Sequence, residues 1–237
     1  MSETGWTTDE MMTVEAARRV ADGTVCFVGI GLPSLAVNLA RQTHAPNAVL
    51  IYESGPIGSK PTVPPLSIGD GELARTADFT VPVPEMFAYW LQGGRIDVGF
   101  LGAAQIDRRG NLNSTVIGDY ASPKVRLPGA GGAPEIATSV RDVFVLLRQS
   151  PRAFVERLDF RSSVGTNVRV VVTDHGVLEP GAGGELVLTR LHPGRTVEGA
   201  REATGWELRV AEPVEETEPP TKAELAALRT LTKGAAA

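Results

Sequence analysis

The chain has 237 residues, of which 42% are hydrophobic and 22% charged, and its formal net charge is −5. This length supports a sizeable buried core, and no apolar run approaches the roughly 20 residues that span a bilayer. The acidic balance and the lack of any Lys/Arg run longer than two argue against nucleic-acid binding. A single cysteine, Cys26, excludes an intrachain disulfide, and three dispersed histidines lack metal-ligand spacing, so we expect no metal.

The first elements form a strand–loop–helix unit. The N-terminal segment lacks the basic head and cleavage site of a secretory signal, so we expect a cytoplasmic protein. Apolar spacing predicts a helix over 11–21, a buried strand over 25–28 and a second helix over 35–43. The loop Gly29-Ile-Gly31 lacks the third glycine of a dinucleotide fingerprint and is followed by Pro33. A tight structural turn is therefore favoured over an NAD site.

The next predicted strand, 48–52, leads into Glu53-Ser54-Gly55 at its carboxyl end, where open α/β sheets bind their ligands. A lone glutamate in such a position is more often solvated or salt-bridged than catalytic. Small residues follow this one, however, and leave room for a ligand beside the carboxylate. A carboxylate attacks a thioester when preorganised donors meet the resulting oxyanion. Glycine loops offer such backbone donors, and the candidates are Gly29-Ile-Gly31, Gly102-Ala103 and Gly129-Ala-Gly131-Gly132.

The remaining segments continue the alternation of strands and helices. Six prolines within 56–84 predict an ordered loop that wraps over the site instead of a long regular element. A helix over 85–92 precedes a strand over 96–101. Further strands are predicted over 143–147, 168–173 and 185–191, and a short helix over 196–204. The pattern predicts an α/β fold with an open mixed, largely parallel sheet covered by helices.

The C-terminal end differs in composition from the rest of the chain. Residues 212–220 are acidic and proline-rich, and Thr221-Lys-Ala-Glu224 has the pattern of a capping box that opens a helix. We therefore expect one domain over 1–210, followed by a connector and a C-terminal helix over 211–237. The helix is expected to dock on this subunit or on a partner.

A set of short segments spans most of the chain. Its members are Gly29-Ile-Gly-Leu-Pro33, Glu53-Ser-Gly55, Gly102-Ala-Ala-Gln-Ile-Asp107, Gly110-Asn-Leu-Asn-Ser-Thr115, Ile117-Gly-Asp-Tyr120, Ser122-Pro-Lys124, Gly129-Ala-Gly-Gly132, Val172-Thr-Asp174 and Gly176-Val177. Together they resemble the β subunit of family I CoA-transferases of the glutaconate type, with the fold of the CoA-transferase/NagB group. In the related oxoacid transferases the turn after the glutamate usually contains Asn-Gly, so Ser54-Gly55 fits the glutaconate branch better.

The resemblance implies a covalent mechanism on Glu53. The carboxylate attacks an acyl-CoA thioester, the CoA thiolate then attacks the glutamyl carbonyl, and the glutamyl-CoA thioester passes CoA to a second acid. The resemblance also places Gly102 and Ala103 beside the oxyanion and Gln105 in the site. Substrate or CoA contacts are implied for Gly29, Gly31, Ser54, Gly55, Gly131 and Gly132, the last two shaping the CoA thioester pocket.

The resemblance further implies that this chain is half of an enzyme. A separate, similar α subunit would complete the pocket, and α2β2 is the expected assembly. CoA would be a substrate and product with no permanently bound cofactor, and the acyl group would come from a dicarboxylic or oxo acid.

Two other classes of function remain open. An acyl-CoA hydrolase, a decarboxylase or a carbon–carbon bond hydrolase would use the same fold, although relatives that left transfer chemistry tend to have replaced the glutamate that Glu53 retains. Water can still intercept a glutamyl-CoA intermediate. A non-catalytic metabolite sensor is the more distant alternative, since no DNA-binding module accompanies the domain.

Several polar motifs have a structural interpretation. Asn111 and Asn113 are expected to fix a turn through side-chain to backbone hydrogen bonds. Asp119 and Lys124 would form a structural pair, Tyr89-Trp90 would serve packing, and Asp174-His175-Gly176 would form a turn between two strands.

Overall fold

The computed structural model describes residues 5–233, which group into two compact units. The first unit contains the described residues up to Phe100, with Ser139–Arg141 and the segment from Pro219 onward. The second contains Leu101–Thr138 and Asp142–Glu218. This division does not follow the boundary at residue 210 that composition suggested, because the C-terminal segment returns to the first unit.

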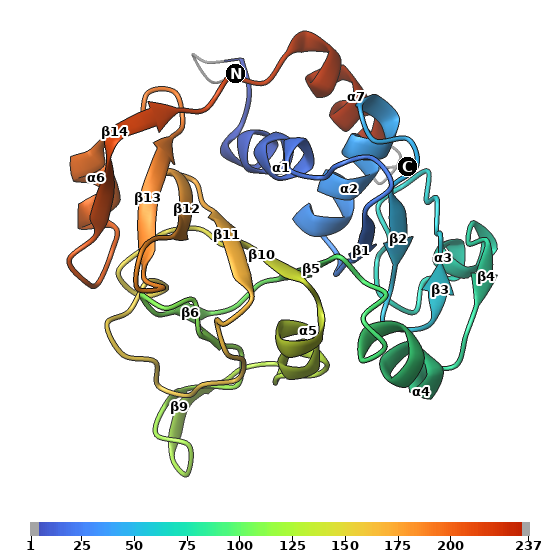
Figure 1. Ribbon diagram of the computed structural model, residues 1–237, viewed down its shortest axis with the longest axis horizontal. Helices are drawn as coiled ribbons and strands as arrows, with labels where there is room; N and C mark the ends of the chain where they lie inside the picture. The colour runs from blue at the N-terminus through green and yellow to red at the C-terminus, as the bar shows by residue number, and fades with distance from the viewer. Residues whose placement is uncertain (1–4, 234–237) are drawn as a thin grey trace. The chain divides into compact units, whose positions relative to one another are not determined.

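The first unit is built on three parallel strands, with β1 in the middle (Figure 1). These are β1 (Val25–Phe27), β2 (Val49–Ile51) and β5 (Val98–Leu101). Beyond β2, the short strands β3 (Pro56–Ile57) and β4 (Phe79–Thr80) continue the sheet by antiparallel pairing. Each parallel strand consists of β-branched and other apolar residues, as expected where helices cover a sheet.

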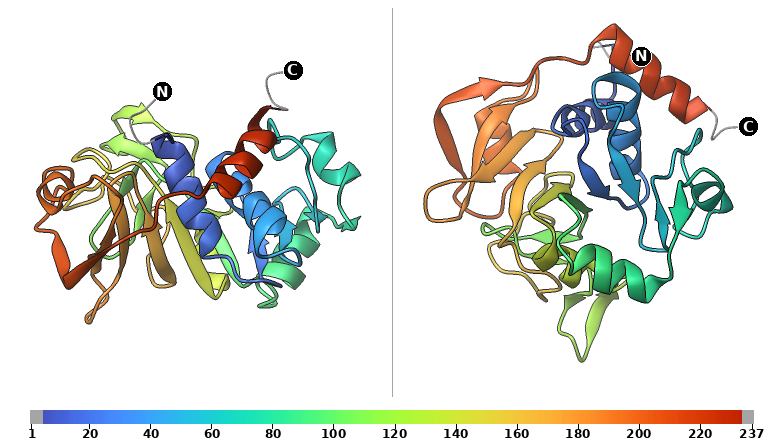
Figure 2. Two further views of the ribbon diagram at one scale, coloured as in Figure 1. Left: turned by 90° about the horizontal axis from the view of Figure 1, so that it is seen from above. Right: turned by 45° about the vertical axis from the view of Figure 1, so that its right-hand side comes forward.

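Three helices of the first unit pack against one another: α1 (Thr8–Arg18), α2 (Leu32–Thr43) and α7 (Lys222–Lys233) (Figures 1 and 2). The first begins before the predicted residue 11 because Thr7 and Glu10 form a capping box, which carries no apolar signal. The second begins at Leu32 because Pro33 is tolerated in a first helical turn.

The C-terminal helix α7 is confirmed, and it docks on the same subunit. Arg18 donates two hydrogen bonds of 2.8 Å to the Glu224 carboxylate, and Arg229 donates to both oxygens of Glu10 at 2.6 and 3.1 Å. Leu228 and Leu231 on its inner face are buried. Charge pairing and apolar burial thus both hold α7 against the N-terminal part of the chain.

The proline-rich stretch contains more short structure than the sequence predicted. Besides β3 and β4 it includes α3 (Gly71–Arg75) and α4 (Val83–Glu85), which leads into the π-helix η1 (Met86–Leu91). Trp90 of η1 packs against Phe79 and Tyr89, with ring centroids 5.9 Å apart in both pairs. The predicted packing role of Tyr89-Trp90 is confirmed.

The second unit has a run of five strands in which each strand pairs with the next (Figure 1). They are β10 (Asp142–Leu146), β11 (Val168–Val172), β12 (Gly176–Pro180), β13 (Leu186–Leu191) and β14 (Arg209–Glu216). The first and last pairs are parallel and the two middle pairs antiparallel.

Part of the predicted acidic connector is therefore a strand, β14. The prediction of an irregular segment failed there because β14 lies at the end of the strand order, and edge strands accept the charges and proline that a central strand excludes. The Asp174–Gly176 turn between two strands is confirmed, since it links β11 to β12.

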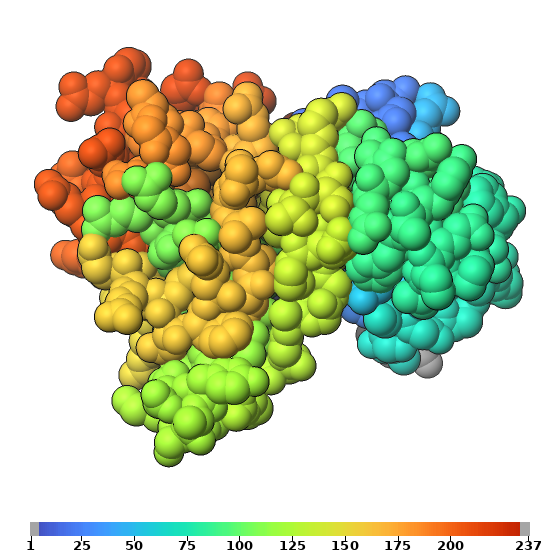
Figure 3. Space-filling model, turned by 60° about the horizontal axis from the view of Figure 1, so that its bottom comes forward, coloured from blue at the N-terminus to red at the C-terminus, as the bar shows by residue number. Residues whose placement is uncertain are grey.

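Two small hairpins and two helices complete the second unit. The hairpins are β6 (Gln105–Ile106) with β7 (Leu112–Asn113), and β8 (Val116–Gly118) with β9 (Pro123–Arg126). The helices are α5 (Ala133–Ser139), whose last residue belongs to the first unit, and α6 (Val197–Glu202). The β8–β9 hairpin projects as a largely exposed ribbon (Figure 3).

The α/β fold class is confirmed, with parallel strands at the centre of the first unit and helices packed around a mixed sheet. Cys26 is a buried residue of β1, as predicted, and burial raises the pKa of its thiol. Within residues 5–233, no helix combines the length and the apolar character needed to cross a membrane.

Candidate active site

Glu53 lies at the carboxyl edge of the parallel strands in the first unit. Phe27 of β1 is level with Ile51 of β2, so Gly29 and Glu53 each follow two residues beyond that aligned pair. The backbone N–H of Val28 donates to the Ile51 carbonyl at 2.9 Å, which continues the pairing up to this point. The glycine loop after β1 and the glutamate after β2 are therefore neighbours at the carboxyl edge of these strands, the edge at which open α/β sheets usually bind ligands.

The turn that carries Glu53 is fixed by backbone hydrogen bonds. Gly55 N–H donates to the Tyr52 carbonyl at 2.9 Å, and Tyr52 N–H donates to the Pro56 carbonyl at 3.1 Å. Val81 N–H donates to the Gly55 carbonyl at 3.0 Å. Gly55 has φ of +115°, and a Cβ there would clash with the Val81 carbonyl oxygen. Only glycine fits this position without moving the backbone.

The Glu53 side chain itself is left free. It is half-buried, and within residues 5–233 its carboxylate has no hydrogen-bond or ion-pair partner. A carboxylate in such a place normally gains a cation or a set of donors. The turn therefore presents an unpaired carboxylate that is available to a ligand.

The start of α2 is tied to the end of β2 directly below Glu53. The Ser34 hydroxyl and the Tyr52 phenol are hydrogen bonded at 2.7 Å in a buried setting. Burial raises the pKa of Tyr52 to about 12, so the phenol stays neutral. Gly31 caps α2 with φ of +80°, and a Cβ at Gly29 would meet no atom within 4 Å. The loop therefore leaves open space above the first turn of α2.

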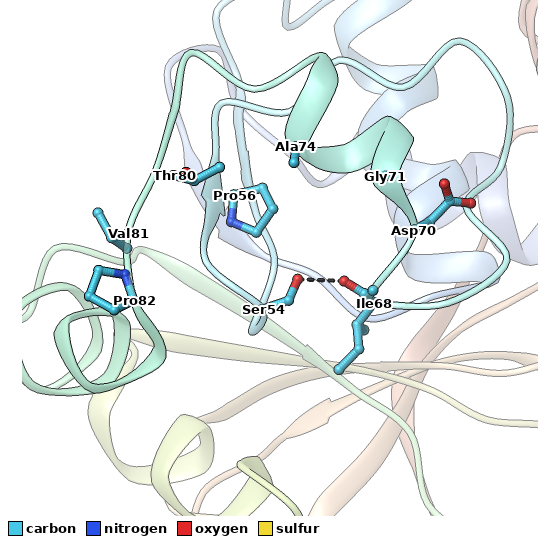
Figure 4. A pocket seen from close by; sticks show the side chains of 10 residues that line it. Ser54, Pro56, Ile68, Asp70, Gly71, Ala74, Thr80, Val81 and Pro82 are labelled. Atoms are coloured by element: carbon cyan, nitrogen blue, oxygen red, sulfur yellow. Dashed lines mark hydrogen bonds between the residues drawn. The ribbon is translucent and has the colours of Figure 1, made fainter.

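A cavity lies beside the Glu53 turn, on the side of Ser54 (Figure 4). It has a volume of about 560 Å³. The Ser54 hydroxyl donates to the Ile68 carbonyl oxygen across it, so the turn and the proline-rich stretch are joined. Its lining comes from these two segments: Ser54, Pro56, Ile68, Gly69, Asp70, Gly71, Ala74, Thr80, Val81 and Pro82.

The sequence predicts only that this stretch wraps over the site, and it marks none of residues 68–82 as a site residue. No compositional signal marks a cavity wall made of Gly, Pro, Ala and Val. The prolines gave the one usable clue, since they predicted ordered irregular structure near Glu53.

The other predicted site residues belong to the second unit, beginning with Gly102 and Ala103. Gly102 follows β5 in the chain and is exposed, and a Cβ there would approach only the Leu146 carbonyl oxygen, at 3.8 Å. Ala103 is half-buried. The next residue, Ala104, donates its N–H to the Asn113 carbonyl at 2.9 Å. This contact anchors the loop at the start of β6.

Gln105 is buried, and both ends of its amide are hydrogen bonded. Its Nε2 donates to Asp159 at 3.0 Å, while its Oε1 accepts from Asn113 Nδ2 at 2.8 Å and from the Asp159 N–H at 3.2 Å. Buried amides are stable only when satisfied in this way. The side chain is thus engaged in a protein network that supports the preceding loop.

Both asparagines make structural side-chain to backbone hydrogen bonds, but only Asn113 fixes its own turn as predicted, since the backbone partner of Asn111 lies 54 residues away. Asn113 Oδ1 accepts the N–H groups of Thr115 and Val116, and Asn111 Oδ1 accepts the N–H of Gly165. Asp119 instead caps its own turn, accepting from the N–H groups of Ala121 and Ser122. The expected pair with Lys124 is wrong for the described structure, because local amides satisfy the carboxylate first.

The glycine loop before α5 is held open by its backbone. Gly129 and Gly131 have φ of +107° and +51°, and a Cβ at either would meet no atom within 4 Å. The Gly129 N–H donates to the Ser114 carbonyl at 2.9 Å. The loop, with Gly132 at its end, therefore offers exposed backbone without a side chain above it.

Of the ten predicted site residues, the structure brings Gly29, Gly31, Glu53, Ser54 and Gly55 together at one edge of the first unit. The other five, Gly102, Ala103, Gln105, Gly131 and Gly132, belong to the second unit.

With the fold and the Glu53 turn described, the whole chain can be compared with known proteins. The family model described as coenzyme A transferase matches residues 9–203. The chain belongs to the coenzyme A transferase family. The resemblance inferred from sequence is confirmed, as is the assignment of this chain to an enzyme of the CoA-transferase class.

The CoA-transferase relatives cover nearly the whole chain. It is 61% identical over 242 residues to one of the subunits of the 3-oxoadipate CoA-transferase of Pseudomonas knackmussii, a match that covers 95% of this chain and 93% of that protein. It is similar to the crystal structure of glutaconate coenzyme A-transferase from Acidaminococcus fermentans, with a TM-score of 0.91 and 30% identity over 99% and 98% of the two chains. The decarboxylase AibA/AibB is also similar, with a TM-score of 0.88 and 29% identity over 96% and 95%.

Proposed function

We propose that this chain is the β subunit of a two-subunit CoA-transferase in which Glu53 carries first the acyl group and then CoA. The observation that carries this proposal is the unpaired Glu53 carboxylate on a rigid turn at the ligand-binding edge of the sheet. The 61% identity to a 3-oxoadipate CoA-transferase subunit favours a 3-oxo dicarboxylic acid as the acyl donor or acceptor.

The proposed reaction is a sequence of acyl substitutions. A Glu53 carboxylate oxygen attacks the thioester carbon of acyl-CoA, the C–S bond breaks, and a mixed anhydride and CoA thiolate are formed. The thiolate then attacks the glutamyl carbonyl carbon, which releases the free acid and leaves a glutamyl-CoA thioester. An acceptor carboxylate repeats these two steps in reverse, so that its acyl-CoA leaves and the Glu53 carboxylate is restored.

Each substitution passes through an oxyanion that backbone donors must stabilise. For that role we assign the exposed loops at Gly102 and Ala103, with Gly29 and Gly31 lying beside Glu53 in the first unit. Gly131 and Gly132 would shape the CoA thioester site. Because the Gln105 amide is already occupied by Asn113 and Asp159, we assign it the role of supporting the Gly102 loop.

The proposal includes a partner. The 3-oxoadipate CoA-transferase relative is itself named as one subunit of its enzyme, and the similar decarboxylase is a pair, AibA/AibB. We therefore expect an α subunit that completes the pocket, in an α2β2 assembly located in the cytoplasm. CoA enters and leaves as substrate and product, with no permanently bound cofactor.

A decarboxylase is the second candidate, since AibA/AibB has a closely similar fold. A hydrolase would also arise if water intercepted the glutamyl-CoA intermediate. Covalent trapping separates transfer from both, because only an acyl-CoA-dependent glutamyl thioester that passes CoA to an added acid supports transfer.

The test uses this chain co-expressed with its α partner. The enzyme is incubated with acyl-CoA donors, treated with hydroxylamine or borohydride, and digested for peptide mapping by mass spectrometry. We expect modification at Glu53 that requires acyl-CoA and is absent from Glu53→Gln. The matched control is Glu207→Gln, an exposed glutamate of the second unit, which should react like the wild type. Full turnover by Glu53→Gln without any modified peptide would refute the proposal.

A further inference from the structure

Two buried hydroxyl groups join the two chain segments of the first unit that meet at the proposed active site. The Ser34 hydroxyl, in the first turn of α2, and the Tyr52 phenol, directly after β2, are hydrogen bonded at 2.7 Å. Ser34 is 1% exposed and Tyr52 is 0% exposed, so neither side chain is open to a substrate. Any contribution of this pair to the reaction therefore acts through the residues beside it.

Tyr52 is held at three points. Its N–H donates to the Pro56 carbonyl at 3.1 Å, its carbonyl accepts the Gly55 N–H at 2.9 Å, and its phenol reaches α2. Glu53 is the next residue in the chain, and its carboxylate has no partner among residues 5–233. A side chain without partners of its own takes its position from its backbone. The placement of the Glu53 carboxylate therefore depends on Tyr52.

Ser34 is fixed on the other side of this hydrogen bond. Its backbone carbonyl accepts from the Asn38 side-chain N–H at 2.9 Å, and Asn38 is itself buried. Gly31 stands three residues before Ser34, and its carbonyl accepts the Leu35 N–H at 3.1 Å. The loop Gly29–Gly31, to which we assign oxyanion donors, is thus continuous with the helical turn that carries Ser34.

The sheet alone does not fix the spacing between these two segments. The pairing of β1 with β2 continues only as far as the hydrogen bond from the Val28 N–H to the Ile51 carbonyl. Beyond that point one segment turns into α2 and the other into the Glu53 turn, and the hydrogen bond between Ser34 and Tyr52 links them. Because a displacement of about 1 Å at a reacting group can cost roughly 100-fold in rate, such a link affects the chemical step.

We infer that Ser34 and Tyr52 are positioning residues, which set the distance between the Glu53 carboxylate and the oxyanion donors of the Gly29–Gly31 loop. The inference rests on the proposed function and adds these two residues to it. Support of this kind preorganises the reacting groups and lowers the barrier of the chemical step. Neither residue lines the cavity beside Ser54, so the binding of substrate is not expected to depend on the pair.

The test removes the two hydroxyl groups singly and together, with Tyr52→Phe, Ser34→Ala and the double variant. Each substitution deletes one oxygen and adds no heavy atom, so neither introduces a steric clash. In the two-subunit enzyme, the release of free acid from acyl-CoA is followed in a single turnover without an acceptor, which separates chemistry from later steps. We expect each single variant to slow this release about tenfold, while KM for acyl-CoA stays unchanged.

The double variant shows whether the two residues act as one unit. Each single substitution already breaks the same hydrogen bond, so the double variant should also be about tenfold slower, whereas independent effects would multiply to about 100-fold. Multiplied effects would overturn the inference, as would a wild-type rate in a folded Tyr52→Phe enzyme. A raised KM with an unchanged single-turnover rate would overturn it too, since the pair would then act in substrate binding.

The control is Thr204→Val in the second unit, which likewise removes a buried hydroxyl. The Thr204 hydroxyl accepts from Gln149 Nε2 and donates to the Ala200 carbonyl, both at 2.8 Å. Urea denaturation should show a loss of stability in both Thr204→Val and Tyr52→Phe, but only Tyr52→Phe should be slow in the single turnover. Equal slowing of the two enzymes would contradict the positioning role, because loss of any buried hydrogen bond would then lower the rate.

Covalent trapping keeps this inference separate from the proposed mechanism. If acyl-CoA modifies Glu53 in the wild type and Tyr52→Phe reacts at the wild-type rate, only the positioning role is wrong. If Glu53 is never modified, yet Tyr52→Phe and Ser34→Ala slow the turnover as expected, the covalent mechanism is wrong and the positioning of this turn stands.

Discussion

The side chains of Glu53 and Gln105 differ in their hydrogen bonding. On either side of Glu53, the backbone of Tyr52 and Gly55 is hydrogen bonded, while the Glu53 carboxylate is left without a partner among residues 5–233. At Gln105 both the amide oxygen and the amide nitrogen are hydrogen bonded, to Asn113 and Asp159. A half-buried polar group without a hydrogen-bond partner lowers the stability of the fold, and it is useful only where a substrate supplies that partner. A polar group whose hydrogen bonds are made within the protein stabilises its own loop. This difference in hydrogen bonding is what we expect between a reactive side chain, Glu53, and a supporting one, Gln105.

The largest effect is expected from Gly55→Ala, which tests the rigidity of the turn. A Cβ there would clash with the Val81 carbonyl oxygen and would also face the positive φ of +115°. Since a displacement of about 1 Å at a reacting group can cost roughly 100-fold in rate, we expect a loss of that order in kcat. Steady-state kinetics of the assembled enzyme measures it.

Gly23→Ala is the matched control, because Gly23 has φ of +77° but open space around it. It carries backbone strain alone, at a cost of about 1–3 kcal/mol, and should keep near wild-type kcat. Equal kcat losses in the two variants would show that the close approach at Val81 does not position Glu53.

Gln105→Ala should have the opposite effect: the free energy of unfolding should fall strongly, and kcat should fall only slightly. It removes one of the two acceptors of the Asn113 side-chain NH2, in a residue that is fully buried, and leaves only the Val116 carbonyl. We expect the free energy of unfolding to fall by about 3 kcal/mol, measured by urea denaturation. Exposed Gln42→Ala should change it by less than about 0.5 kcal/mol. If Gln105→Ala is as stable as the wild type, the Gln105 amide does not support the loop.

The smallest effect concerns pH and His192, a buried residue of the second unit. Its Nε2 donates to the Thr173 carbonyl at 2.8 Å, so Nδ1 accepts from the Thr217 hydroxyl at 2.8 Å and the ring is neutral. Burial lowers the pKa of His192 from 6.5 to about 4. As the pH falls below 6.5, His192 therefore takes up a proton in the unfolded chain before it does so in the folded protein.

Stability should accordingly be complete above pH 6.5 and decline as the pH falls toward 4, by about 2 kcal/mol at pH 5 from this one group. Urea denaturation at pH 7 and pH 5 would measure the decline, and His192→Asn should reduce it. If the wild type and the variant lose the same stability between these pH values, His192 is not the group responsible. Trapping at Glu53 is not expected to follow this decline while the enzyme remains folded.

Sequence reasoning predicted the parts of the site that depend on short, ordered patterns. The position of Glu53 followed from one strand and one turn, and the strand–loop–helix around Gly29 followed from apolar spacing. It gave no bounds for β12, and it missed β14, where charges, proline and an edge position hide the strand signal. It also missed the cavity walls, since Ile68, Ala74 and Val81 meet through tertiary packing that leaves no local pattern. The satisfied state of Gln105 depends on Asp159, which lies 54 residues away in the chain.

The return of α7 to the first unit has a consequence for the order of folding during synthesis. The Glu224 and Glu10 ion pairs join residues 206 and 219 positions apart, so the docking of α7 on α1 must wait until the last described segment has left the ribosome. The strands of the second unit are all made before α7. Domains generally fold as their chain becomes available, so the unit that begins first is expected to be completed last. Until then the apolar faces that α7 covers remain open to chaperones.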